Sequence, residues 1–389
     1  MPDLPKERFK TRVVDIGGVP LGGDHPVRVQ SMTSTDTADT TGTVAQAIRM
    51  IEAGCEYVRI AVPYMKEAEN LREIKKELRR RGYGTPLIAD VHFNAAVAEK
   101  AATIVEKVRI NPGNYVPARI SRHASEHSDN LVLEETAERL APLLKICREH
   151  GTAIRIGVNH GSLSERILTK FGDTPLGMVE SALEFARICE RESFGNLVFS
   201  MKSSNIRMMI TANRLLAERM RAEGMDYPIH LGVTEAGVGD DGRIKSAIGI
   251  GSLLADGIGD TIRVSLTEDP VNEIPAAYAI LQATGVRITA TEYVSCPSCG
   301  RTQFDILAVV EEVKRKTSHL RGLKIAVMGC VVNGPGEMAG AHYGFVGAGS
   351  GKIHLYKGQK LVHRNIETAG AVEAMIELIK ASGDWQDPK

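Results

Sequence analysis

The sequence lacks net charge, since 48 lysines and arginines balance 48 aspartates and glutamates over 389 residues. A chain without excess charge has no overall attraction for nucleic acid or a membrane surface, so we expect neither as a partner. No apolar run is long enough to cross a bilayer. Residues 1–12 are basic but lack the apolar stretch of a signal peptide. These absences predict a cytoplasmic protein in which any recognition of an anion is local.

Cysteine is also scarce, with six residues in the whole chain. A long chain with few cysteines and no secretion signal is not typical of a disulfide framework, and reactive or metal-bound thiols are favoured. Cys55, Cys147 and Cys189 fall on apolar helix or strand-edge patterns, which predicts small core residues. The other three cysteines lie in the last quarter of the chain and need another explanation.

The most frequent pattern in the sequence is an alternation of short aliphatic runs with amphipathic segments of helical period. Strand and helix in regular alternation predict a parallel sheet, and eight strands are the number that closes a TIM barrel. An open doubly wound sheet is the alternative, but residues 248–257 and 347–353 do not complete a dinucleotide or phosphate-loop motif. The predicted strands are residues 27–33, 56–62, 86–92, 107–113, 153–159, 197–204, 229–237 and 261–267.

The pattern changes after residue 285, where a shorter α+β segment begins. We therefore predict a barrel domain over 1–285 and a smaller α+β domain over 286–389, a division that suits the length of the chain. One stretch fits this scheme poorly. Residues 114–130 are long and polar, and we interpret them as a solvated loop or an active-site lid.

Four predicted strands carry an arginine between aliphatic neighbours: Arg59, Arg109, Arg155 and Arg263. A barrel strand is buried on both faces, so each guanidinium needs a partner. Pairing with carboxylates is one explanation, but acids at the strand ends are few. A phosphate or diphosphate ligand is the preferred one. Lys202 adds a cation, and further hydrogen bonds are expected from Asn111, Asn159, Ser200, Ser203, Thr234 and Ser265.

Ionisable groups with a catalytic position follow two of the strands. Asp90 and His92 end the third predicted strand, and Glu235 ends the seventh, at the barrel face where catalytic groups usually lie. Glu235, surrounded by cations, suits a proton donor, although a structural salt bridge is the competing interpretation. His92 is interpreted as a supporting or structural hydrogen-bonding group.

The three remaining cysteines occur in S-C-P-S-C-G (295–300) and M-G-C-V-V-N-G-P-G-E (328–337). A zinc ribbon needs a second pair of ligands, and a dithiol redox pair leaves Cys330 without a purpose. Three thiolates suit three corners of a 4Fe–4S cluster, and Glu337 can hold the fourth iron as an exchangeable ligand, unless it only forms a salt bridge. We therefore predict one 4Fe–4S cluster per chain.

These cysteine motifs, together with residues 110–114, 154–162, 231–237 and 258–266, closely resemble the GcpE (IspG) family of 4-hydroxy-3-methylbut-2-enyl diphosphate synthases. The resemblance runs from the first strand to the last helix. It implies an oxidoreductase with a TIM barrel followed by a sulfite-reductase-like domain. The implied cluster ligands are Cys296, Cys299, Cys330 and Glu337.

The resemblance also implies the reaction. Two electrons, delivered singly by ferredoxin or flavodoxin, open the ring of 2-C-methyl-D-erythritol 2,4-cyclodiphosphate in isoprenoid biosynthesis by the methylerythritol phosphate pathway. Its diphosphate would contact the arginines, Glu235 would donate a proton, and His92 and Asn333 would support by hydrogen bonds. The implied assembly is a head-to-tail homodimer.

Two other functions remain open at this point. A zinc-stabilised module on a barrel would act in binding or assembly, and its protein would be colourless. A barrel that binds a pterin or sugar phosphate without redox chemistry would explain the arginines but would leave the cysteines without a role.

Overall fold

The computed structural model describes residues 8–92, 94–115, 128–332, 334–349 and 351–388. The chain divides into two compact units, one ending at Arg287 and the other beginning at Ile288. Each unit has its own sheet and its own hydrophobic core. Across the described residues, none of the helices combines the length and apolarity needed to cross a bilayer.

The first unit is built on an eight-stranded parallel sheet in the order β8-β7-β6-β5-β4-β3-β10-β9. Phe199 in β8 forms a parallel bridge with Ile229, which directly precedes β9, so the two ends of the sheet meet. The predicted TIM barrel is confirmed. Its strands are β3 (Arg28–Met32), β4 (Tyr57–Ala61), β5 (Leu87–Asp90), β6 (Lys107–Ile110), β7 (Ala153–Asn159), β8 (Leu197–Lys202), β9 (His230–Leu231) and β10 (Thr261–Ile262).

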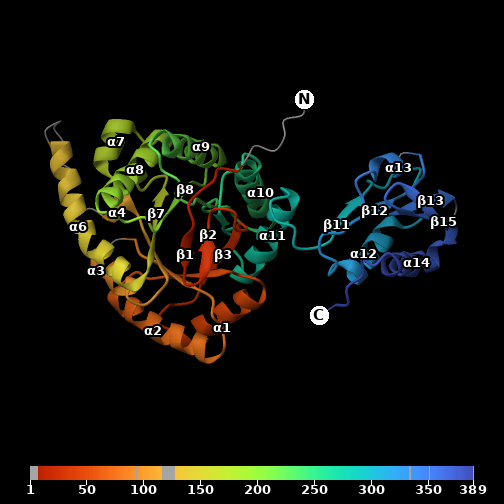
Figure 1. The fold of residues 1–389 in the computed structure, drawn as a ribbon, viewed down its shortest axis with the longest axis horizontal. Helices are drawn as coiled ribbons and strands as arrows, with labels where there is room; N and C mark the ends of the chain where they lie inside the picture. Colours follow the sequence, from red (N-terminus) through yellow and green to blue (C-terminus); the bar gives the residue numbers. More distant parts are fainter. Residues whose placement is uncertain (1–7, 93, 116–127, 333, 350, 389) are drawn as a thin grey trace. The chain divides into compact units, whose positions relative to one another are not determined.

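Helices surround these strands (Figure 1). In α2, Ala68, Leu71, Ile74 and Leu78 recur every three or four residues and are buried, while most other positions are charged. That period gives the helix one apolar face for the barrel. The helices are α1 (Thr40–Glu52), α2 (Met65–Arg80), α3 (Ala95–Ala102), α4 (Pro112–Tyr115), α6 (Ser128–His150), α7 (Glu165–Phe171), α8 (Pro175–Arg191), α9 (Ile206–Ala222), α10 (Gly239–Ala255), the 3-10 turn Pro270–Asn272 and α11 (Glu273–Ala283).

Only part of the polar stretch 114–130 lies within the described residues. Its first residues end α4, its last three begin α6, and residues 116–127 lie outside the described part of the chain. The prediction of a loop or lid is therefore wrong at both ends of the stretch: residues 114–115 belong to α4, and α6 starts earlier than its apolar pattern indicates.

A short hairpin of β1 (Val14–Ile16) and β2 (Val19–Leu21) precedes the barrel and was not predicted. Val14, Ile16 and Leu21 are fully buried, and they pack with Tyr57 and Ile88 near the amino ends of the barrel strands. The hairpin therefore covers the end of the barrel opposite to the one where TIM-barrel active sites lie.

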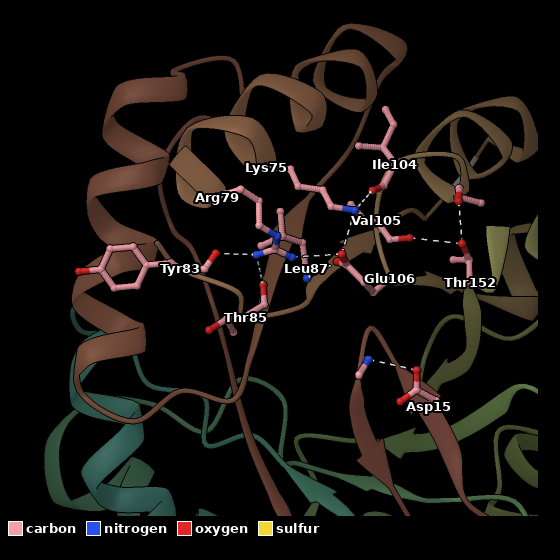
Figure 2. A network of polar contacts seen from close by, with 12 residues as sticks. Asp15, Lys75, Arg79, Tyr83, Thr85, Leu87, Ile104, Val105, Glu106 and Thr152 are labelled. Atoms are coloured by element: carbon pink, nitrogen blue, oxygen red, sulfur yellow. Dashed lines mark hydrogen bonds and ion pairs between the residues drawn. The ribbon is translucent and has the colours of Figure 1, made fainter. Parts of the chain in front are cut away.

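Glu106 connects this same end of the barrel to helix α2 (Figure 2). Its carboxylate accepts a hydrogen bond from Leu87 N at 2.8 Å and pairs with Lys75 Nζ at 2.8 Å and Arg79 Nη2 at 3.2 Å. A methyl group added to Gly17 in the hairpin turn would lie 2.5 Å from Glu106 Cγ. One carboxylate thus fixes a strand start and a helix, and the hairpin turn packs closely against it.

The second unit has a mixed sheet in the order β11-β12-β13-β14-β15. The first three strands are parallel and the last two are antiparallel additions. α12 and α14 pack with the sheet in one apolar cluster, and Met338, directly after α13, belongs to another. The elements are β11 (Glu292–Ser295), α12 (Ile306–Thr317), β12 (Lys324–Met328), α13 (Gly334–Glu337), β13 (Tyr343–Gly349), β14 (Lys352–Lys357), β15 (Lys360–Glu367) and α14 (Thr368–Ala381). The predicted small α+β domain is confirmed.

Candidate active site

The barrel interior gathers the five cationic side chains that the sequence singles out: Arg59, Arg109, Arg155, Lys202 and Arg263. We call this group the cation cup. Arg59, Arg109 and Arg155 are 7%, 2% and 1% exposed, and Lys202 is also buried. The positive charges of the four arginines all lower the pKa of Lys202, after burial itself, so the five groups are close neighbours.

Asp90 is the carboxylate at the centre of the cup. Arg59 Nη2 lies 2.6 Å from Asp90 Oδ2, and Arg109 Nη1 lies 3.3 Å from Oδ1. His92 Nε2 lies 3.3 Å from Oδ2. Burial alone would raise the pKa of Asp90, but the charges of Arg59 and Arg109 outweigh it and hold the pKa well below 3.8. Asp90 is therefore ionised and orients two arginines.

Arg109 is held on its other side by β7. Its Nη2 donates to Gly157 O at 2.8 Å and to Asn159 Oδ1 at 3.1 Å. A Cβ at position 157 would lie 2.4 Å from Arg109 Nε, so only glycine leaves room for this side chain. Gly232 has the same role beside Lys202, whose Nζ would lie 2.8 Å from an added Cβ.

Arg263 has a carboxylate partner that the sequence analysis missed. Its Nε and Nη2 each lie 3.1 Å from one oxygen of Glu273, in the fork geometry typical of an arginine–carboxylate pair. Glu273 is 2% exposed and also accepts from Ser31 Oγ at 2.7 Å. For this arginine, pairing by a carboxylate accounts for its burial.

Arg155 is different, because its Nε and Nη1 have no hydrogen-bond partner among the residues that the structure describes. The two carboxylates of the group, Asp90 and Glu273, face the five cations of the cup. A buried excess of positive charge is costly without an anion. The cup therefore has the composition of an anion site.

Polar groups expected near the cup lie at the carboxyl ends of the strands. Asn111 is fully buried, and within the described chain its Nδ2 has no partner. Ser200 is buried, Ser265 is half-buried, and Ser203 Oγ accepts from Asn205 N at 3.0 Å. Asn111 is thus the clearest unused donor of this set.

Glu235 lies in the loop after β9. Its side chain is exposed and its backbone has a φ of +53°, a left-handed conformation that costs energy for a residue other than glycine. Such strain is concentrated at functional sites, which agrees with the sequence-based prediction of a catalytic role for Glu235.

The three cysteines lie near the carboxyl ends of strands β11 and β12 in the second sheet. Cys296 follows β11, Cys330 lies two residues after β12, and these parallel neighbours end side by side. Cys296, Cys299, Cys330 and Glu337 all line one pocket of about 140 Å³, together with Arg301. The nearby Arg301 lowers the pKa of the exposed Cys299 thiol by hydrogen bonding and charge.

The chemistry of this donor set fits an iron–sulfur cluster. Three thiols and a carboxylate surround one space, and Gly329 N donates to Cys296 Sγ at 3.1 Å, the kind of bond that tunes cluster thiolates. In the described residues, no three His, Cys, Asp or Glu side chains already converge at metal-binding distances. Asn333 lies outside the described residues. Cys55, Cys147 and Cys189 are buried, which confirms them as core residues.

Besides Glu273, two further interior residues were missed by the sequence analysis. Lys107 and His230 are fully buried, and Lys107 lies two residues before Arg109 on the same strand. Side chains two apart on a strand share a face, so this period is the signal that would have found Lys107. Arg301 was also missed, and only its place between the two cysteine motifs points to it.

Comparison with known proteins adds the following matches. Residues 11–278 match the model of the GcpE TIM-barrel domain, and residues 292–381 match that of the GcpE protein C-terminal domain. A 4-hydroxy-3-methylbut-2-en-1-yl diphosphate synthase (ferredoxin) from Synechocystis sp. is 55% identical over 390 positions, covering 99% of this chain and 96% of its own. The synthase of the same name from Trichormus variabilis is 54% identical over 99% of this chain and 95% of its own. From these matches over nearly its whole length, the chain belongs to the GcpE family.

Proposed function

We propose that this protein is a ferredoxin-dependent 4-hydroxy-3-methylbut-2-en-1-yl diphosphate synthase. It would open the ring of 2-C-methyl-D-erythritol 2,4-cyclodiphosphate reductively and release water. The observation that carries the proposal is the pairing, in one chain, of a buried cation excess in a barrel with a three-cysteine, one-glutamate pocket. The names of the closely similar relatives support it.

The cation cup would bind the diphosphate. Asp90 holds Arg59 and Arg109 in fixed directions, and the free edge of Arg155 supplies donors that the protein itself leaves unused among the described residues. Asn111, Asn159, Ser200, Ser203 and Ser265 would complete the hydrogen bonds. Because the donors are already oriented, little side-chain freedom is lost when the anion binds.

Cys296, Cys299 and Cys330 would hold the 4Fe–4S cluster, with Glu337 at the fourth iron. A bound cluster of this kind supplies low-potential electrons singly and a Lewis-acidic iron. Glu337 is exposed, on the one-turn helix α13, where a carboxylate can leave an iron without disturbing a core. Arg301, in the same pocket, would balance the negative charge of the thiolates.

Glu235 would donate the proton that the departing oxygen needs. Its strained backbone lies in the loop after β9, from which the carboxyl would reach the substrate, and His92, bonded into the Asp90–Arg109 group, would orient the substrate nearby. Glu235→Gln keeps the shape but removes the proton, so turnover should fall at least about a hundredfold. Full turnover of this variant with a strong artificial reductant would remove Glu235 from the role.

A head-to-tail homodimer and ferredoxin or flavodoxin as electron donor complete the proposal, following the family resemblance. The zinc-stabilised barrel is not favoured, because the curated relatives that cover nearly the whole chain are named as redox synthases.

The test is anaerobic reconstitution with iron and sulfide. Cys330→Ser should lose the cluster absorption and turnover of the cyclic diphosphate. Cys147→Ser, which changes a buried barrel cysteine, should keep both. A colourless wild-type protein that binds one zinc, or a Cys330→Ser variant with an intact cluster and normal turnover, would contradict the proposal.

A further inference from the structure

Beneath the cation cup, toward the amino ends of the strands, the barrel interior is unusually polar. TIM-barrel interiors are layers of four side chains from alternate strands, and branched aliphatic residues dominate them. Here the strand registers place Gln30, Ile88, His230 and Arg155, the lowest member of the cup, in one layer. They place Tyr57, Lys107, Val198 and Thr261 in the layer below it. Only two of these eight side chains are aliphatic.

Most of the polar atoms in these two layers are unpaired. Both ring nitrogens of His230, both amide atoms of Gln30, Lys107 Nζ and Thr261 Oγ1 have no hydrogen-bond partner in the described part of the chain. His230 and Lys107 are fully buried, and Gln30 is 1% exposed. An interior with so many open donors and acceptors is built for something other than apolar packing.

Lys107 is the most unusual member. Its Nζ lies 4.8 Å above the centroid of the Tyr57 ring. The charged groups that act on it are Arg155 of β7 and Arg59 of β4, both cations, and His230 of β9 is a further titratable neighbour. β5 contributes the apolar Ile88. Burial first, and then the two arginines, hold the pKa of the ammonium well below 10.5.

We propose that Lys107 is neutral while the cation cup is empty and takes a proton from solvent when a diphosphate ligand binds. Lys107 would then be a positioning residue for anion binding that never touches the ligand. The inference rests on the proposed function for the identity of that ligand.

The physical reason is the balance of charge inside the barrel. With the cup empty, an ammonium at position 107 adds a further positive charge to an interior in which cations already outnumber carboxylates. A bound cyclic diphosphate brings two negative charges, which offset Arg155 and Arg59 and remove the repulsion on Lys107. The bound state therefore holds the proton more tightly, and binding and proton uptake are linked.

The sign of the pH dependence follows. When a ligand raises the pKa of a group, the ligand binds more weakly as the pH rises from the pKa of that group in the free protein to its pKa in the complex. For each proton taken up, affinity falls about tenfold per pH unit. Each phosphorus of the cyclic diphosphate carries a single strongly acidic oxygen, so the ligand does not titrate near neutral pH. Uptake then belongs to the protein, with Lys202 and His230 as the other candidates.

The test is titration calorimetry of the reconstituted protein with the cyclic diphosphate, without reductant, in buffers of different ionisation enthalpy. Wild type should take up on the order of one proton per ligand. Lys107→Met removes the amine and keeps the volume. This variant should take up fewer protons per bound ligand than wild type, by roughly half a proton or more, and its ligand affinity should depend less steeply on pH. Lys66→Met, an exposed lysine on α2, is the matched control and should match wild type.

A merely structural lysine predicts something else. If Lys107 only supported the fold, Lys107→Met would lower the melting temperature and leave the proton count per bound ligand unchanged. We expect the reverse, with unliganded Lys107→Met at least as stable as wild type, because an unpaired buried amine has been removed. Lys107→Gln, also neutral, should reproduce the lost uptake if the methionine variant does not fold.

Two failures are distinguishable. Wild type that binds the cyclic diphosphate without proton uptake, or variants whose uptake and pH slope equal those of wild type, overturns the inference and leaves the synthase intact. Wild type that neither binds nor converts the cyclic diphosphate overturns the proposed function, and the inference falls with it.

Discussion

Single residues in this protein act mainly by directing charge. Asp90 is one carboxylate that fixes two arginines and a histidine, and its own ionisation is secured by the same arginines. Glycine has an equally specific role, because Gly157 and Gly232 provide the space that Arg109 and Lys202 occupy. Small residues beside large cations are therefore part of the proposed anion site and not only of the backbone.

Gly157→Ala tests this role of a missing side chain. The added methyl would lie 2.4 Å from Arg109 Nε, so the guanidinium must move from Gly157 O and Asp90. Displacing one charge-assisted donor costs about 1.5–3 kcal/mol, which corresponds to a roughly 10- to 150-fold weaker binding of the cyclic diphosphate. Dissociation constants measured by calorimetry give the answer.

Gly251→Ala is the control for this substitution. Its added methyl meets only Thr284 Cγ2, at 3.6 Å, and position 251 lies inside helix α10, where alanine is favourable. We expect unchanged ligand affinity for this variant. Equal affinity of Gly157→Ala and wild type would contradict the close packing described for Arg109.

Among secondary-structure elements, the barrel strands were predictable from their short aliphatic runs. Each of the eight barrel strands lies within one of the predicted runs, because a strand buried on both faces is apolar along its length. β9 and β10 are shorter than predicted, with two residues each. The arginines within β4, β6 and β7 stood out against that background for the same reason. Hairpin β1–β2 was not predictable in this way, since its strands have only three residues each and no period can be read from three positions.

The sequence could not predict which residues of different helices and strands pair with one another. Glu273 lies at the start of helix α11, and nothing in its local pattern indicates that it pairs with Arg263, which directly follows strand β10. Lys107 was overlooked although it shares the period of Arg109, because the first residue of a strand looks like a solvated end. Only the covering hairpin makes that end an interior.

Glu106 provides a prediction at the scale of elements. Glu106→Gln keeps an acceptor for Leu87 N but loses the charge that attracts Lys75 and Arg79. Because these cations are about one-third exposed, we expect a loss of only about 1 kcal/mol of barrel stability. Glu106→Ala also leaves Leu87 N without an acceptor and should lose about 1–3 kcal/mol more.

The chain carries its own control for that measurement. Trp385 is the single tryptophan and lies in the second unit, where it packs beside that unit's core. In the Glu106 variants, the thermal unfolding transition of the barrel, followed by circular dichroism, should shift. The unfolding transition followed by tryptophan fluorescence should stay at the same temperature. Glu77→Gln, at an exposed pair on α2, should change neither transition appreciably. A Glu106→Ala variant with an unshifted barrel transition would contradict the bracing role.

At the scale of the whole molecule, one chain joins two separately cored units, each with half of what the proposed mechanism needs. The barrel offers a buried cation excess and the second unit offers three thiols and a carboxylate around one pocket. The measurement that tests this account most directly is an anaerobic assay of reconstituted protein with reduced ferredoxin and the cyclic diphosphate. We predict that two ferredoxins are oxidised for each 4-hydroxy-3-methylbut-2-enyl diphosphate formed. Ferredoxin that stays reduced in the presence of bound cyclic diphosphate, with no product, would contradict it.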